Sequence, residues 1–200
     1  IRLLDLTHPL GADANVPPGL PQPYVDTVRT MASHGRNSSV MTVPAHTGTH
    51  LDAPWHVSDD GQDIASIELD RLIGPAVVWH IPQGDPPSGI GTAELAAARP
   101  AVRPGDAVLL STGWARKYGT PAYHQRPWLT VEGAIWLREH GVRLVGMDFA
   151  NPEQPPSQHQ MSMDFRDHHE LLDHGVLIVD RKSTRLNSSH SQQSRMPSSA

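Results

Sequence analysis

Residues 46–56 read HTGTHLDAPWH, and this stretch decides how the rest of the chain is interpreted. Three histidines and one aspartate stand at even positions in it, namely His46, His50, Asp52 and His56. In an extended chain alternate side chains share a face, so these four would project to one side. Gly48 and Pro54 both disfavour a helix here. The pattern therefore predicts a cluster of imidazole and carboxylate groups on one face of an extended segment.

Such a cluster has the chemistry of a metal site. Imidazole and carboxylate groups together are the ligands that zinc, manganese and ferrous iron prefer. Gly48 removes a side chain where the backbone must turn close to a bound ion. The alternative is that these are ordinary surface or core histidines, since the chain has thirteen. Four metal-binding groups within eleven residues are a much stronger signal, and we interpret the stretch as a catalytic metal site.

Residues 180–200 have a different character from the rest of the chain. They begin with DRKSTRLNSSH and end with SRMPSSA, which resembles the translation of a sequencing-library adapter. A natural serine-rich tail is the alternative. We expect an artefactual disordered tail at 180–200 and a native domain at 1–179, truncated at its C-terminus. Because the chain begins at Ile1, we also expect its N-terminus to be incomplete.

Composition excludes several classes of protein. The formal charge of the whole chain is −5, and it becomes −8 when the four basic residues and one acidic residue of the tail are set aside. An acidic chain without a basic stripe is a poor nucleic-acid binder. The absence of cysteine rules out disulfides and thiolate chemistry. No apolar run approaches membrane-spanning length, so we expect no membrane partner and a cytoplasmic protein.

The remaining pattern alternates strand and helix signals. Strands are expected at 1–7, 38–45, 76–81, 107–111, 142–149 and 176–179, and helices at 92–99, 130–140 and 165–174. Thr92 and Thr130 are expected to cap two of these helices. Residues 11–37 lack a sustained period and are expected to form a long loop. This order predicts a single α/β domain with a mixed sheet flanked by helices.

Residues 46–56 also resemble a known family. The stretch matches the HxGTHxDxPxH signature of the cyclase family of metal-dependent hydrolases, which includes bacterial kynurenine formamidase and isatin hydrolase. Looser matches lie at 5–10 (DLTHPL), 111–114 (STGW) and 141–148 (GVRLVGMD). The resemblance covers most of residues 1–179. It implies the swivelling β/α/β fold, a homodimer or higher homo-oligomer, and one or two divalent ions of zinc or manganese.

The resemblance also implies roles for individual residues. His46, His50 and Asp52 would hold one metal ion, and Asp52 could bridge to a second ion near His168. The alternative for His168 is an exposed helical histidine. The family has a glutamate twelve residues after this histidine, where the chain has Asp180. Because Asp180 lies in the suspected tail, we do not expect it to act as a ligand.

The implied activity is hydrolysis of a C–N amide bond by metal-activated water, in tryptophan catabolism. His56 would be the catalytic proton-transfer residue, with a fourth metal ligand as its alternative role. Trp55 and Trp114 are candidate substrate-binding residues, which would suit an aryl formamide such as N-formylkynurenine. Isatin-like lactams are the second substrate class. A metal- or small-molecule-binding protein without turnover, and a truncated chain without activity, are the remaining alternatives.

Overall fold

The computed structural model describes residues 3–12, 14–156 and 164–181. Its helices are α1 (Met31–His34), α2 (Thr92–Ala97), α3 (Val131–Glu139) and α4 (Arg166–Leu172). Its strands are β1 (Tyr24–Arg29), β2 (Ser38–Thr42), β3 (His50–Asp52), β4 (Ala76–His80), β5 (Gly89–Ile90), β6 (Ala107–Ser111), β7 (Trp128–Leu129), β8 (Leu144–Met147) and β9 (Leu177–Asp180). Short 3-10 helices occupy Pro54–His56, Ile64–Ser66, Leu69–Leu72, Trp114–Lys117 and Pro121–His124.

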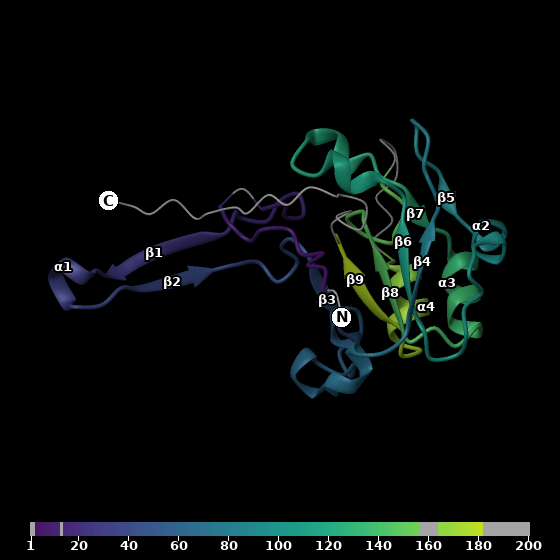
Figure 1. Cartoon of the computed structure of the whole chain (residues 1–200), viewed down its shortest axis with the longest axis horizontal. Coiled ribbons are helices and arrows are strands. Elements are labelled where there is room, and N and C mark those ends of the chain that lie inside the picture. The colour runs from purple at the N-terminus through teal and green to yellow at the C-terminus, as the bar shows by residue number, and fades with distance from the viewer. Residues whose placement is uncertain (1–2, 13, 157–163, 182–200) are drawn as a thin grey trace.

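A five-stranded mixed sheet forms the centre of the α/β body (Figure 1). Its strand order is β3-β9-β8-β6-β4. The last four strands in this order run parallel to one another, and β3 pairs with β9 in the antiparallel direction. The sheet confirms the predicted mixed α/β class. Two further pairs, β1 with β2 and β5 with β7, lie outside this sheet.

Alternation along the strands divides the core between the two faces of the sheet. Val108 and Leu110 of β6 join the large cluster that also contains residues of α2, α3 and α4. Ala107, Leu144 and Leu177 belong to the smaller cluster on the other face. Because successive side chains of a strand point to opposite faces, the register assigns every sheet residue to one of these sides. The helical side is the one that matters for the candidate site.

The structure confirms the central strands and the three predicted helices within a few residues. The expected strands at 76–81 and 107–111 are β4 and β6, and the expected strand at 142–149 is the shorter β8. Thr130 caps α3 as predicted, since its hydroxyl accepts a hydrogen bond from the Gly133 amide. The predicted cap of α2 is wrong by one residue. Gly91 occupies that position, and Glu94 bonds back to its amide.

Two predictions for the N-terminal part are wrong. Residues 3–7 form no strand, and the expected loop at 11–37 contains β1 and α1. Strands β1 and β2 build a two-stranded hairpin that projects away from the sheet (Figure 1). All six β1 residues are exposed, so no buried face gave the sequence a period that could be recognised.

Helix α3 packs closely against the edge of the small β5–β7 pair. A Cβ atom at Gly133 would lie 2.7 Å from the Ile90 carbonyl oxygen and 3.0 Å from Leu129 Cδ1. Alanine is normally the better helix former, by about 1 kcal/mol. Here the backbone contact outweighs that gain.

Gly133→Ala should lower the free energy of unfolding by about 1–3 kcal/mol in urea denaturation. Glu139→Ala, at an exposed position of the same helix, should change it little, and a stabilised Gly133→Ala would contradict this packing.

Candidate metal centre

Residues 46–56 form a turn, the strand β3 and a 3-10 helix, one after the other. Gly48 has a φ of 59°, in the left-handed region that favours glycine, and the chain turns there into β3. Only residues 50–52 are extended, so His50 and Asp52 share a face as the alternation predicts. His46 precedes the turn, and His56 lies in the 3-10 helix Pro54–His56. The four side chains therefore do not project from a single extended segment as expected.

Three donor atoms of the motif nevertheless converge on one point. His46 Nδ1 lies 2.9 Å from His50 Nε2 and 3.0 Å from Asp52 Oδ1. His50 Nε2 lies 3.3 Å from the same carboxylate oxygen. Ligands bound at about 2.1 Å around a tetrahedral ion are separated by about 3.4 Å. The spacing of these atoms therefore matches three ligands of one divalent ion. The other ring nitrogen of His50 is hydrogen-bonded to the Gly48 carbonyl, which fixes the ring.

The register of β9 adds a second carboxylate beside them. His50 is paired with Asp180 and Asp52 with Ile178, so all four side chains share the face of the sheet that α4 covers. Asp180 is buried, and its Oδ1 has no hydrogen-bond partner. His50, Asp52 and Asp180 offer ligand atoms that lie within 4.8 Å of one another.

This placement bears on the suspected tail. Asp180 ends β9, and the carbonyl of the next residue, Arg181, accepts a hydrogen bond from the Thr49 hydroxyl. The structure therefore places the Asp180 carboxylate beside the motif, although its position in the suspected tail gave no expectation that it would act as a ligand. The boundary between residues 179 and 180 remains a prediction, because residues 182–200 lie outside the described part of the chain.

His168 reaches the same region from α4. It is fully buried, so the alternative of an exposed helical histidine is wrong. Its Nδ1 lies 2.8 Å from Glu153 Oε1. The same oxygen accepts a hydrogen bond from the backbone amide of His168. Its Nε2 is buried and has no hydrogen-bond partner. A neutral imidazole that donates Nδ1–H to a carboxylate presents Nε2 as a free lone pair, which is the arrangement of a metal-ligating histidine.

These observations fit a divalent ion. Buried polar atoms in native proteins are almost always paired, and here Asp180 Oδ1 and His168 Nε2 lack partners around a set of clustered ligands. Nitrogen and carboxylate donors without thiolates suit zinc or manganese. His46, His50 and Asp52 would hold one ion, and His168 with Asp180 could hold a second beside it.

The carboxylates of the site have strongly altered proton affinities. Burial opposes ionisation of Asp52, but hydrogen bonds and charges from His46 and His50 outweigh it and hold its pKa well below the usual range. Burial and the neighbouring Asp52 charge raise the pKa of Asp180 to about 7. Two carboxylates this close cannot both ionise cheaply. A divalent cation would remove that repulsion and allow both to be charged.

His56 lies between the two halves of the site. Its ring centroid is 4.2 Å from that of His46 and 5.2 Å from that of His168. Burial lowers the pKa of His56 to about 4, with Asp52 acting in the opposite direction and His46 in the same one. The imidazole is therefore neutral at physiological pH and can accept a proton. It could also join His46 and Asp52 as a ligand, since their ligand atoms lie within 4.8 Å of one another.

The two candidate substrate-binding tryptophans lie in different environments. Trp55 is 63% exposed beside His56, so it is free to contact a substrate or another surface. Trp114 is buried in the main core, its indole N–H donates to the Tyr123 carbonyl, and Lys117 lies over its ring. These contacts give Trp114 a structural role, and its contact with substrate remains a prediction.

Glu153 is the functional candidate that the sequence analysis missed. It follows β8, at the carboxyl edge of the parallel strands where ligands commonly bind in α/β sheets. The sequence offered only that position as a signal, because an isolated glutamate in a proline-rich stretch has no spacing that links it to His168. Its contact with His168 depends on how α4 packs, which the local pattern does not encode.

Comparisons with known proteins identify the family of the chain. A family model described as a putative cyclase matches residues 4–154, and the chain belongs to that family. Kynurenine formamidase from Bacillus cytotoxicus is 30% identical over 181 residues, covering 88% of this chain and 80% of that one. The Geobacillus thermodenitrificans kynurenine formamidase is 30% identical over 179 residues with the same coverage.

Solved structures show the same fold. Isatin hydrolase A from Labrenzia aggregata, bound to benzyl benzoate, superposes with a TM-score of 0.78 at 21% identity, covering 92% of this chain and 81% of that one. A predicted metal-dependent hydrolase from Bacillus stearothermophilus superposes with a TM-score of 0.72 at 24% identity, covering 94% of this chain and 85% of that one.

Within the described residues, no helix is both long and apolar enough to span a membrane.

The contact between Glu153 and His168 predicts a loss of metal affinity when the carboxylate is neutralised. Glu153→Gln keeps the size of the side chain but weakens its hold on His168 Nδ1–H, so zinc affinity should fall about 10–100-fold. Competition with a chelating dye measures this directly. Glu132→Gln, which lines the same surface pocket without a bond to His168, is the matched control. Equal affinities for both variants would exclude the role given to Glu153.

Asp167 predicts a pH dependence of stability in the metal-free protein. Burial and the charge of Glu153 raise the pKa of Asp167 to about 8. The folded state holds the proton of Asp167 more tightly than the unfolded state does, so this contribution to stability is complete below about pH 4 and is lost progressively as pH rises from 4 to 8. Asp167→Asn should therefore be more stable than the wild type at pH 9 in chelator, and little different at pH 4. The same difference at both pH values in urea denaturation would contradict the assignment.

Proposed function

We propose that the protein is a metal-dependent hydrolase of the cyclase family that cleaves a C–N amide bond, with aryl formamides such as N-formylkynurenine as its substrate class. The observation that carries the proposal is the convergence of His46, His50 and Asp52 beside the neutral imidazole of His56. The 30% identity to kynurenine formamidases supports the formamide over a lactam. The isatin hydrolase likeness supports the fold alone.

Each residue has a definite part in this proposal. His46, His50 and Asp52 would hold the first ion, and His168 and Asp180 would hold a second. A bound divalent ion supplies hydroxide near neutral pH and stabilises the charge that develops on the carbonyl oxygen. His56 accepts a proton as the nucleophile attacks and passes it to the leaving nitrogen. Its low pKa keeps it neutral and ready for the first of these transfers.

The same proposal includes the identity of the metal, the type of substrate, the oligomeric state and the location of the protein. We propose zinc or manganese as the metal, because the family resemblance implies these ions and the nitrogen and oxygen donors suit them. The substrate is a small molecule, and the chain works as a homodimer or higher homo-oligomer. We also propose a cytoplasmic location and, from the resemblance to kynurenine formamidases, a part in tryptophan catabolism.

Two single substitutions test the proposal. His50→Ala removes a metal ligand, so it should lower both the metal content and hydrolysis of N-formylkynurenine to background. His56→Ala should keep one or two ions per chain while kcat falls about 10²–10⁴-fold. Elemental analysis and a spectrophotometric assay measure the two quantities on the same samples. Isatin as a second substrate tests the lactam alternative.

The outcomes separate the competing functions. Metal without turnover in the wild type, on both substrates, would favour a binding protein over an enzyme. Loss of metal in His56→Ala would make His56 a ligand and contradict its proton-transfer role. A folded wild-type chain that contains no metal would overturn the hydrolase proposal for this chain.

A further inference from the structure

The segment that carries Glu153 belongs to neither a helix nor a strand. Residues 151–153 lie between β8 and α4. Glu153 nevertheless holds one carboxylate oxygen at a defined point, because Oε1 accepts hydrogen bonds from both Nδ1 and the backbone amide of His168. A side chain is held this closely only when the backbone that carries it is itself fixed. The contacts of residues 151–153 therefore determine where Glu153 lies.

Three successive backbone carbonyls of this segment accept hydrogen bonds from one neighbouring stretch of chain. Arg126 Nη1 donates to the Asn151 carbonyl at 2.8 Å and to the Glu153 carbonyl. Between them, the Leu129 amide donates to the Pro152 carbonyl at 2.8 Å. Among the described residues, Arg126 is the only side chain that donates to a carbonyl of this segment. Its one nitrogen atom therefore holds the backbone on both sides of Pro152.

Arg126 is a buried cation. Burial lowers the pKa of Arg126 to about 10, with the charge of Asp180 acting in the opposite direction, so the guanidinium remains charged at neutral pH. A buried charge is costly unless its surroundings compensate it. In the described part of the chain, both hydrogen bonds that Arg126 donates go to carbonyls of residues 151–153. Charged donors make stronger hydrogen bonds than neutral ones, so this side chain is suited to holding a loop.

We propose that Arg126 is a positioning residue for the metal centre. It fixes residues 151–153 so that Glu153 meets His168, and His168 in turn presents Nε2 to the second ion. The backbone hydrogen bond from Leu129 remains when Arg126 is replaced, so the segment stays attached while Glu153 loses the anchor of its own carbonyl. The inference rests on the metal centre of the proposed function and is independent of the reaction catalysed there.

Replacing Arg126 tests this role through metal affinity. Arg126→Met removes both hydrogen bonds but keeps a long side chain in the buried site. Zinc competition with a chelating dye should show about 10-fold weaker binding of the second ion and little change for the first. Arg126→Lys should stay within about three-fold of the wild type. Both bonds come from one nitrogen atom, which an ammonium group can replace, whereas a two-nitrogen fork would not tolerate lysine.

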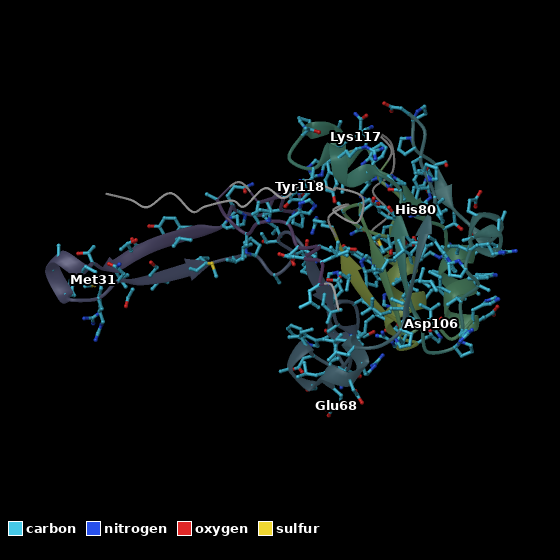
Figure 2. All side chains as sticks on the ribbon, viewed as in Figure 1. Met31, Glu68, His80, Asp106, Lys117 and Tyr118 are labelled. Atoms are coloured by element: carbon cyan, nitrogen blue, oxygen red, sulfur yellow. The ribbon has the colours of Figure 1, made fainter. Side chains whose placement is uncertain are left out.

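Arg143→Met is the matched control. Arg143 also donates to two backbone carbonyls, those of Arg71 and Pro75, but it precedes β8 rather than following it. Its amide donates to the Asp106 carbonyl, and Figure 2 shows Asp106 at the end of the sheet opposite to Lys117. The control variant therefore loses the same kind of contact far from the metal centre, and it should bind both ions like the wild type.

A double-mutant cycle separates positioning from general destabilisation. If Arg126 acts through Glu153, Arg126→Met should weaken the second ion by less than about two-fold further in a Glu153→Gln background. A further loss of about 10-fold there, or unchanged affinity in Arg126→Met alone, would overturn the inference. The cycle is also run with Arg126→Gln, whose amide stays polar in the buried site, so that the test does not depend on one variant that fails to fold.

A metal-free measurement distinguishes failure of this inference from failure of the proposed function. The ring N–H of His168 that donates to Glu153 should give a downfield proton resonance, assigned by its loss in His168→Gln. This resonance should shift or disappear in Arg126→Met and persist in Arg143→Met. Its absence from the wild type, or its persistence unchanged in Arg126→Met, would overturn the inference. A wild type that shows the resonance and binds no zinc would count against the proposed function alone.

Discussion

The candidate site depends on the antiparallel pairing of β3 with β9. This register sets His50 opposite Asp180 and Asp52 opposite Ile178, and it turns both ligands of β3 toward the helical side of the sheet. A shift of one residue would send His50 and Asp52 to the other face, away from His168. The three-residue strand β3 is also an edge strand, so its position depends on β9 alone within the sheet. Strand β9 is therefore as important to the metal centre as the histidine motif.

Burial explains why this arrangement needs a cation. Asp52, Asp180 and His168 are almost completely buried, and the first two are carboxylates close to each other. Moving a charge from water into a protein interior is costly unless a partner compensates it. In the absence of an ion, the histidines hold Asp52 ionised, and a pKa raised to about 7 opposes ionisation of Asp180 beside it. The same donors, freed of protons, are suited to a divalent metal.

The sequence predicted what is local and missed what depends on packing. The central strands have continuous apolar runs, and the histidine motif is a contiguous signature, so both could be recognised. Glu153 reaches His168 only because α4 packs beside the segment after β8, and no sequence spacing encodes that contact. The β1–β2 hairpin gave no period that could be recognised, because both its faces are exposed. Asp180 is not expected to be a ligand from the sequence, because it belongs to a stretch that resembles an adapter. Its position in β9 nevertheless makes it a neighbour of His50.

The central claim is that the motif holds a metal ion at one defined point. An anomalous difference map from a crystal grown with zinc and measured at the zinc absorption edge tests it most directly. The account predicts a strong peak about 2.0–2.2 Å from His46 Nδ1, His50 Nε2 and Asp52 Oδ1. A map with no peak there, or with its strongest peak at another cluster of acids on the protein, would contradict it.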